Sequence, residues 1–274
     1  MKSSGGRHAL VTVVVIGFLL AGSFAAGAEE AEADGRITLG TGMESLASRD
    51  QMGSPFLYRG GGHPVWVAAH RQGGHWRWGM DWRGSVSGWN AAWMEAAISD
   101  GKRHRAEAVS VEGSLYLQGL VASEGGHQLF LGGELSNWTF FRSYHYDEHQ
   151  IGAVEIWEAP VVLNARAEMV RRLGAWELSV AALVPVGGRM LRPNYAIRGD
   201  ERIEMVERRL QILRYGSWAS WNRLQMLRGI AGMGWRRERL GLRLEASAGW
   251  LRYQGDWETR AGRVQALFGA EIHF

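Results

Sequence analysis

Most of the chain alternates between apolar and polar residues with a period of two, which is the pattern of a β-strand with two different faces. The clearest example runs from residue 75 to residue 88, where tryptophans occupy one face and charged residues occupy the other. The pattern recurs along the chain and predicts ten strands. Their ranges are 36–46, 65–69, 75–88, 109–117, 129–135, 161–167, 176–184, 222–235, 240–250 and 264–274.

The connections between these predicted strands alternate between short and long. Short connections fall at 73–74, 123–126, 174 and 236–239, and glycines mark the first three as turns. The long connections are predicted at 47–63, 91–105, 142–156, 187–220 and 254–262. Bacterial transmembrane β-barrels have short periplasmic turns and longer extracellular loops. We therefore predict an all-β, antiparallel transmembrane β-barrel of ten strands, with both chain ends on the short-turn side.

A secreted β-sandwich gives the same alternation with its apolar face turned inward, and it is the main alternative to the barrel. The predicted strands are long enough to cross a membrane when tilted, which favours the barrel. The 14 tryptophans of the chain also suit a barrel, because aromatic girdles mark both membrane surfaces in that class. The tryptophans expected to face the membrane are Trp76, Trp78, Trp82, Trp176 and Trp250.

The end of the chain carries a further signal. Gly269, Ile272 and Phe274 place a glycine, an apolar residue and a final aromatic residue at fixed spacing. This ending resembles the C-terminal signature of bacterial outer-membrane β-barrel proteins, although Leu267 stands where a polar residue is expected. The resemblance implies residence in the bacterial outer membrane and recognition of the last strand by the machinery that inserts barrels.

Residues 1–28 have the composition of a secretory signal peptide. Lys2 and Arg7 precede an almost wholly apolar run at 9–24, and small residues follow at 26–28. The run is shorter than the roughly 20 residues of a spanning helix. We predict cleavage before residue 29, which leaves 29–274 as one barrel domain. The formal net charge of +3 then falls close to zero, and no basic stripe predicts a nucleic-acid partner.

The polar faces of the predicted strands would line the barrel interior, and they carry both signs of charge. The interior candidates are Arg77, Asp81, Arg83, Glu112, Glu134, Arg166, Glu168, Arg243 and Glu245. Barrels of about eight strands are filled by side chains, whereas about 16–18 strands leave an aqueous channel. One interpretation is a structural interior of interlocked ion pairs, because a buried charge is costly unless it is paired. The other is a narrow passive channel for small polar solutes.

The predicted connection at 187–220 is long enough to carry structure of its own. Ile203, Val206, Leu210 and Leu213 recur at helical spacing within it. A helix here would cover the barrel mouth or fold inward as a plug. Two strands instead would make the barrel twelve-stranded, and this alternative stays open.

Enzyme chemistry has little support in the sequence. Residues 145–149 match the H-x-x-E-H pattern of some zinc peptidases, but they follow a predicted strand and lie in a predicted loop. The omptin outer-membrane proteases are also ten-stranded, yet this chain has no acid pair of the D-x-D type. The chain has no cysteine and therefore no thiol nucleophile. We expect a structural or surface-binding outer-membrane barrel without cofactor or metal, with a channel and then a hydrolase as alternatives.

Overall fold

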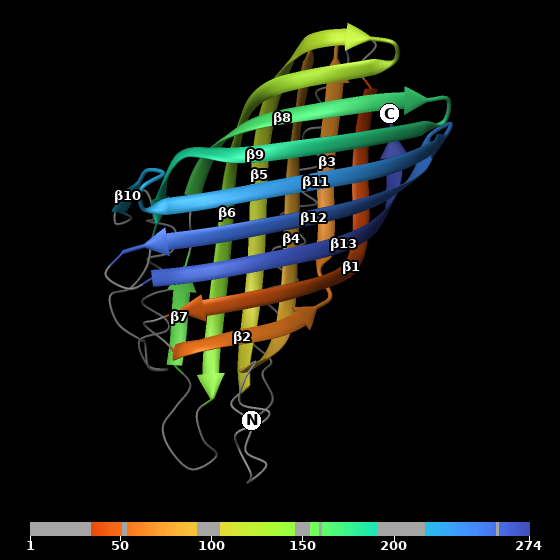
Figure 1. Ribbon diagram of the computed structural model, residues 1–274. Helices are drawn as coiled ribbons and strands as arrows, with labels where there is room; N and C mark the ends of the chain where they lie inside the picture. Colours follow the sequence, from red (N-terminus) through yellow and green to blue (C-terminus); the bar gives the residue numbers. More distant parts are fainter. Residues whose placement is uncertain are drawn as a thin grey trace.

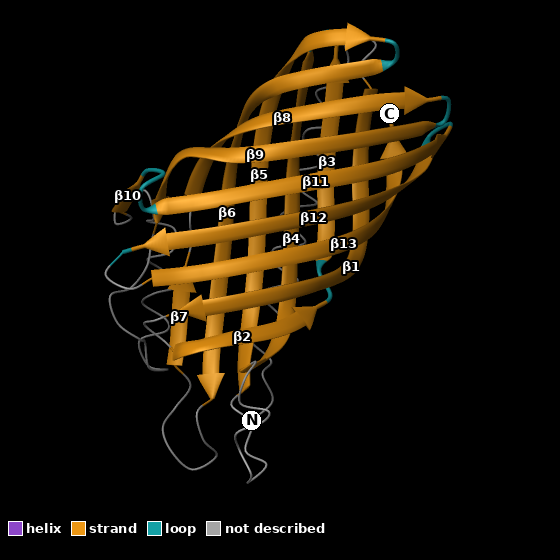
Figure 2. Ribbon diagram, viewed as in Figure 1, coloured by secondary structure: helices purple, strands orange, loops and turns teal. Residues whose placement is uncertain are grey.

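The computed structural model describes residues 34–50, 54–91, 105–145, 154–158, 161–190, 217–255 and 258–274. All regular structure in these segments is β-strand (Figure 1 and Figure 2). The described segments contain no helix that is long and apolar enough to cross a membrane. The predicted signal peptide at 1–28 lies outside the described residues.

Thirteen strands form one continuous antiparallel sheet. They are β1 (Asp34–Asp50), β2 (Ser54–Gly62), β3 (Val65–Gly73), β4 (Trp76–Ala91), β5 (Arg105–Glu124), β6 (His127–His145), β7 (Val154–Glu158), β8 (Val161–Leu173), β9 (Trp176–Met190), β10 (Ser217–Ala219), β11 (Leu224–Arg237), β12 (Leu240–Gln254) and β13 (Glu258–His273). The front wall in Figure 1 crosses the back wall steeply, because the strands are tilted around a closed barrel.

The sheet closes because its first and last strands pair along nearly their whole length. The register of β1 with β13 runs from Arg36 opposite His273 to Asp50 opposite Thr259. This pairing removes both sheet edges, as a membrane-spanning sheet requires.

Ten barrel strands make up the ring, which confirms the predicted number. β2 and β3 both pair with β1 and β4, so they are two halves of one barrel strand interrupted at His63 and Pro64. β7 and β8 both pair with β6 and form another such strand. β10 and β11 both pair with β9 and form a third, so the thirteen strands make ten barrel strands. The twelve-stranded alternative is wrong, because β9 pairs directly with β11, with Trp176 opposite Trp235.

The four predicted short turns are confirmed, and each leaves two residues between its strands. Gly74, Gly125, Gly126 and Gly174 have positive φ angles of 54–80° in these turns. Such angles cost little only for glycine. In the fourth turn Glu238 takes the same conformation, with a φ of 55°. We call this end of the barrel the short-turn end and the opposite end the long-connection end.

Two of the predicted long connections are wrong in extent. The 47–63 connection is largely strand, because β1 continues to residue 50 and β2 occupies 54–62. The 254–262 connection shrinks to the few residues between the end of β12 and the start of β13. The alternation fades here because inward-facing residues such as Leu46, Tyr58 and Leu251 are themselves apolar and buried.

The outward face carries an apolar band bordered by aromatic residues. The five tryptophans expected to face the membrane, Trp76, Trp78, Trp82, Trp176 and Trp250, alternate with buried residues and lie on this face. Trp176 and Trp235 lie opposite one another at the short-turn end, and Trp218 and Trp250 lie towards the long-connection end. Aromatic girdles at two levels are typical of membrane-spanning barrels.

Replacing Glu238 with glycine is expected to stabilise the barrel. A left-handed conformation costs a residue with a Cβ atom about 1–2 kcal/mol, and the added freedom of the unfolded chain returns about half of this. We expect E238G to raise the free energy of unfolding by about 0.5–1 kcal/mol, measured by urea titration in detergent micelles. The matched variant E124G lies at a strand end without positive φ and should give no gain. An equal gain from both variants would contradict the assignment of strain to Glu238.

Candidate functional site

The barrel interior is the candidate functional site, and its long-connection end is filled by an apolar layer. Side chains from strands on all sides of the barrel meet there in one buried cluster. Its members are Leu46, Tyr58, Ala108, Trp138, Phe140, Val162, Met190, Ala219, Leu224, Met226, Leu251, Tyr253 and Ala261. These side chains are at most 7% exposed, so they occupy the described interior at this level. The alternation of the sequence does not reveal this layer, because it predicts polar residues on the inward faces.

A charged layer follows directly towards the middle of the barrel. Glu112 on β5 accepts hydrogen bonds from Arg228 on β11 and Arg263 on β13. Arg83 on β4 binds Asp81 at 2.7 Å and reaches Glu245 on β12 at 2.5 Å. These charges are almost fully buried, and their pairing across the lumen satisfies them where water is excluded.

A second group of ion pairs lies nearer the short-turn end. Arg166 on β8 binds Glu134 on β6 at 2.5 Å and Glu168 on its own strand at 2.9 Å. Arg77 on β4 lies 3.0 Å from the other oxygen of Glu168. The guanidinium of Arg166 therefore bridges two carboxylates, and Glu168 bridges two guanidinium groups.

A third group of charged residues lies at the short-turn end. Arg36 on β1 donates a 2.7 Å hydrogen bond to Glu177 on β9 and lies 3.5 Å from Glu271 on β13. Arg243 on β12 approaches Glu177 at 3.6 Å. A polar pocket of about 430 Å³ opens beside this group, towards the turn that contains Glu238.

Aromatic rings separate the charged groups and face their guanidinium planes. Arg166 lies 4.2 Å from the ring centroid of Tyr116, and Arg263 lies 4.4 Å from that of Trp138. A guanidinium over an aromatic face is stabilised by the ring quadrupole, and more strongly where water is absent. The stacked rings also occupy volume that would otherwise be open lumen.

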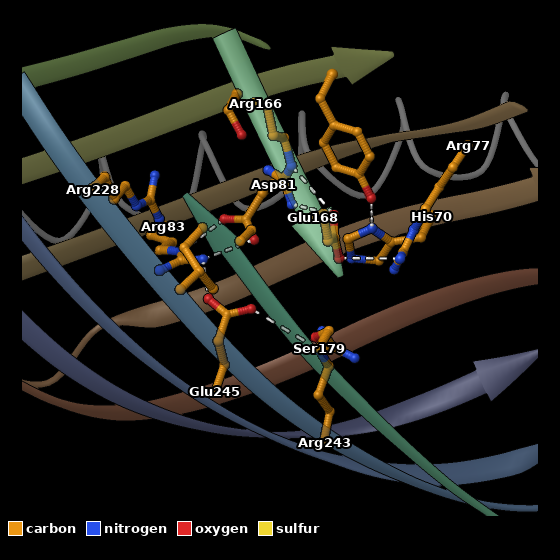
Figure 3. Close-up of a pocket in the computed structure, with 14 residues that line it drawn as sticks. His70, Arg77, Asp81, Arg83, Arg166, Glu168, Ser179, Arg228, Arg243 and Glu245 are labelled. Carbon is orange, nitrogen blue, oxygen red and sulfur yellow. Dashed lines mark hydrogen bonds and ion pairs between the residues drawn. The ribbon is translucent and has the colours of Figure 1, made fainter. Parts of the chain in front are cut away.

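The space left in the middle of the interior is small. A cavity of about 20 Å³ lies between the charged groups, and Figure 3 shows the residues around it. His70 and Tyr116 are joined there by a hydrogen bond at the wall of the cavity. This volume is close to the least that one water molecule needs. The cavity between these charged groups is therefore large enough for about one water molecule.

The interior candidates of the sequence analysis all contribute to this network. Arg77, Asp81, Arg83, Glu112, Glu134, Arg166, Glu168, Arg243 and Glu245 are buried or half-buried and point inward. Arg77 and Asp81 lie on one face of β4 but have different partners, Glu168 and Arg83. Arg36, Glu177 and Arg228 complete the groups and are not among the predicted interior residues. Arg36 and Glu177 alternate with apolar residues and were identifiable by that signal, whereas glycines obscure the alternation around Arg228.

The C-terminal signature lies on β13, where it closes the ring. Ile272 and Phe274 point outward and are about half exposed, whereas Gly269 points inward. A Cβ atom on Gly269 would lie 2.7 Å from a methyl group of Thr38 and 3.2 Å from the ring of Trp66. The glycine therefore lets the ring of Trp66 pack against the β1–β13 seam.

The other sequence candidates fall mostly on residues that are not described. His145 is the last residue of β6, and residues 146–149 of the H-x-x-E-H pattern lie outside the described residues. The helical spacing predicted within 200–213 lies outside them too. Among the described residues, no group of histidine, aspartate and glutamate side chains is arranged to hold a metal ion.

Comparison with known proteins shows a shared fold. No protein-family model matches the sequence, and no curated protein matches it. The structure is similar to the outer-membrane protease OmpT of Escherichia coli, with a TM-score of 0.55, 13% identity, and coverage of 88% of this chain and 96% of that one. The translocator domain of the autotransporter NalP of Neisseria meningitidis matches with a TM-score of 0.40, 10% identity, and coverage of 97% and 98%. At 13% identity the likeness to OmpT concerns the fold and carries no activity to this chain.

Removing Glu112 is expected to destabilise the protein severely. The change E112A leaves Arg228 and Arg263 as buried charges without their shared carboxylate, and such losses cost about 3–5 kcal/mol. The control E258A removes a partly exposed partner of Arg252 and should cost less than about 1 kcal/mol. Urea unfolding followed by tryptophan fluorescence measures both.

A triple variant separates lost pairing from lost packing. E112L/R228M/R263L removes all three charges together, so no buried charge is left unpaired. Because apolar replacement of a buried ion group is often neutral, this variant should recover most of the stability lost in E112A. If the triple variant is as unstable as E112A, pairing is not what Glu112 contributes.

Proposed function

We propose that the protein is an integral outer-membrane β-barrel with a closed interior, which acts as a structural protein or binds a surface ligand through its long connections. The observation that carries this proposal is the filling of the lumen by consecutive layers. The apolar layer around Trp138 and Phe140 lies above the ion-pair groups, and only about 20 Å³ remains between those groups. A barrel filled in this way gains rigidity and gives solutes no path.

The outward face supports residence in a membrane. From Leu240 to Trp250, the outward residues of β12 are apolar or small. The described outward residues beside them on β13 and β1 are apolar or small as well. That span matches the about 9–11 residues with which a tilted strand crosses a bilayer. The predicted signal peptide and the C-terminal signature support the outer membrane as the destination. We propose that the insertion machinery engages β13 through Phe274 and Ile272.

A narrow passive channel is the second candidate function. The polar pocket of about 430 Å³ at the short-turn end favours it, because Asp34, Arg36 and His273 line an entrance of the kind a solute would use. The ion pairs of Arg36 and Arg77 lie directly behind this entrance and oppose further passage. A hydrolase is the third candidate and would place its chemistry in the long connections. The similarity to OmpT extends to the fold and does not name a reaction for this chain.

Planar-bilayer recording tests the closed interior directly. The purified, folded protein is expected to give no discrete current steps, because side chains fill the apolar layer and the space between the ion-pair groups. Heat-modifiable gel mobility of the same sample shows that the barrel is folded. Discrete steps that scale with salt concentration would overturn the proposal and favour the channel.

Charge reversal at Arg77 distinguishes a structural ion pair from a pathway lining. R77E places a second carboxylate against Glu168, so a structural interior should lose thermal stability without gaining current. The matched exposed variant R237E should leave both properties unchanged, because it lies on the outside of the short-turn end. If R77E instead changes the ion selectivity of a measurable current, Arg77 lines a pathway.

A further inference from the structure

A row of arginines crosses the outside of the barrel at the long-connection end. Arg252 on β12 lies opposite Arg260 on β13, and Arg260 lies opposite Arg49 on β1. All three alternate with buried residues and therefore point outward. Neighbouring strands lie about 4.8 Å apart, so the three guanidinium groups reach into one patch of surface. We call these three residues the arginine row, and Arg59 on β2 lies one step below it, opposite Ala47.

One carboxylate among the described side chains belongs to this patch. Glu258 binds Arg252 at 2.5 Å and Arg260 at 3.0 Å, which fixes both guanidinium groups at the surface. Because this one carboxylate does not balance the arginine row and Arg59, the described side chains of the patch carry a net positive charge. The side chains of Arg252 and Arg260 remain 30% and 51% exposed, which leaves donors for a further anion.

The arginine row marks the edge of the apolar band. Below it on β12, the outward positions from Trp250 down to Leu240 are apolar or small. On β13 and β1, the next outward-facing residues below Arg260 and Arg49 are Gly262 and Ala47, which are also small. In a membrane-spanning barrel, such an edge lies at the level of the lipid headgroups. The arginines therefore stand where phosphate groups of lipids lie.

An apolar groove begins directly beneath the arginine row. It has a volume of about 650 Å³ and runs across β9, β11, β12, β13 and β1. Its floor is made of small residues in two neighbouring rows. Ala182, Gly229 and Ala248 lie in register across β9, β11 and β12, whereas Gly262 and Ala47 lie in register across β13 and β1, two residues nearer the arginine row.

The walls of the groove are larger side chains. Val184, Leu227 and Trp250 stand along it and are 39–47% exposed. Trp250 lies between Leu227 and Gly262 in the row next below the arginines. A long apolar chain that enters between these walls would cover the small residues and restore a smooth outer surface.

We propose that this surface binds an anionic, phosphate-bearing lipid of the leaflet at the long-connection end, with its phosphate on the arginine row and an acyl chain in the groove. Arginine suits this role because its planar fork binds phosphate oxygens through two hydrogen bonds at once. The arginine row lies at the headgroup level and the groove lies below it, which is the order of the phosphate and the acyl chain in one lipid. The inference rests on the proposed membrane residence of the barrel.

Lipid retention measured by native mass spectrometry tests the site. The full-length mature protein is placed in bilayer nanodiscs of phosphatidylcholine with a minor fraction of phosphatidic acid, and the lipids that stay bound are counted. We expect phosphatidic acid to be retained about tenfold above its share of the bilayer, which corresponds to two charge-assisted hydrogen bonds at an interface. R252Q/R260Q should reduce this enrichment to about twofold or less, because the remaining arginines act as point charges.

A second variant tests the groove separately. A Cβ atom at Gly229 or Gly262 would meet no atom within 4 Å, so leucine fits at both positions without disturbing the sheet. G229L/G262L should therefore fold normally and still lose the enrichment, because the leucines occupy the place of the acyl chain. The control G88L/G113L adds leucines at outward glycines elsewhere, where Gly113 has no neighbour nearer than 3.9 Å and Gly88 has none within 4 Å. It should retain the lipid as the parent protein does.

A charge control completes the design. R171Q/R237Q removes two exposed outward arginines at the short-turn end and should leave the enrichment unchanged. An equal loss in this control would show general attraction to a charged bilayer and overturn the site. Equal displacement by dissolved inorganic phosphate, with no effect of the groove variant, would overturn the role of the acyl chain and with it the lipid proposal.

The same experiment separates this inference from the proposed function. Heat-modifiable mobility is recorded for each variant in the same nanodiscs. A protein that fails to insert as a folded barrel would overturn both proposals. A protein that inserts but retains both lipids in proportion to the bilayer would overturn only the lipid site.

Discussion

The closure of β1 on β13 is the constraint on which the rest of the structure depends. A sheet surrounded by lipid has no water to satisfy its edge, so its first and last strands must pair. Once the ring is closed, the alternation of side chains divides every strand into a lipid face and an interior face. Ten strands enclose a space narrow enough for those interior side chains to meet across it. The filled interior is therefore a consequence of strand number as much as of the residues themselves.

The interior solves the problem of buried charge by sharing partners. Glu112 serves Arg228 and Arg263, and Glu168 serves Arg77 and Arg166. Each carboxylate thus joins strands that are not neighbours in the sheet, while the aromatic rings keep water away from the pairs. Rigid cross-bracing of this kind is what a structural barrel needs. It is also what a conducting barrel must avoid.

Much of this arrangement is predictable from the sequence, and the failures have physical causes. Period-two alternation locates all ten barrel strands and places Arg77, Glu112 and Arg166 on inward faces, because the side-chain period of a strand is fixed. The same signal fails near Leu46 and Tyr58, where inward residues turn apolar and the contrast between faces disappears. Local patterns also cannot give partners across a lumen. The partner of Arg77 depends on the tilt and stagger of the whole ring, which no single strand carries.

The ion pairs across the lumen also have a consequence for the order of assembly. Arg83 and Glu245 are separated by 162 residues in the chain, and Arg263 and Glu112 by 151. These pairs across the lumen form only when the last strands have arrived. Arg83 also has Asp81 on its own strand, but Glu112 and Arg263 would be exposed to lipid in an open sheet. Contacts so distant in sequence also make folding slow. The network therefore favours insertion of a nearly complete cylinder into the bilayer. The last seam then closes and the charges are buried in one concerted step.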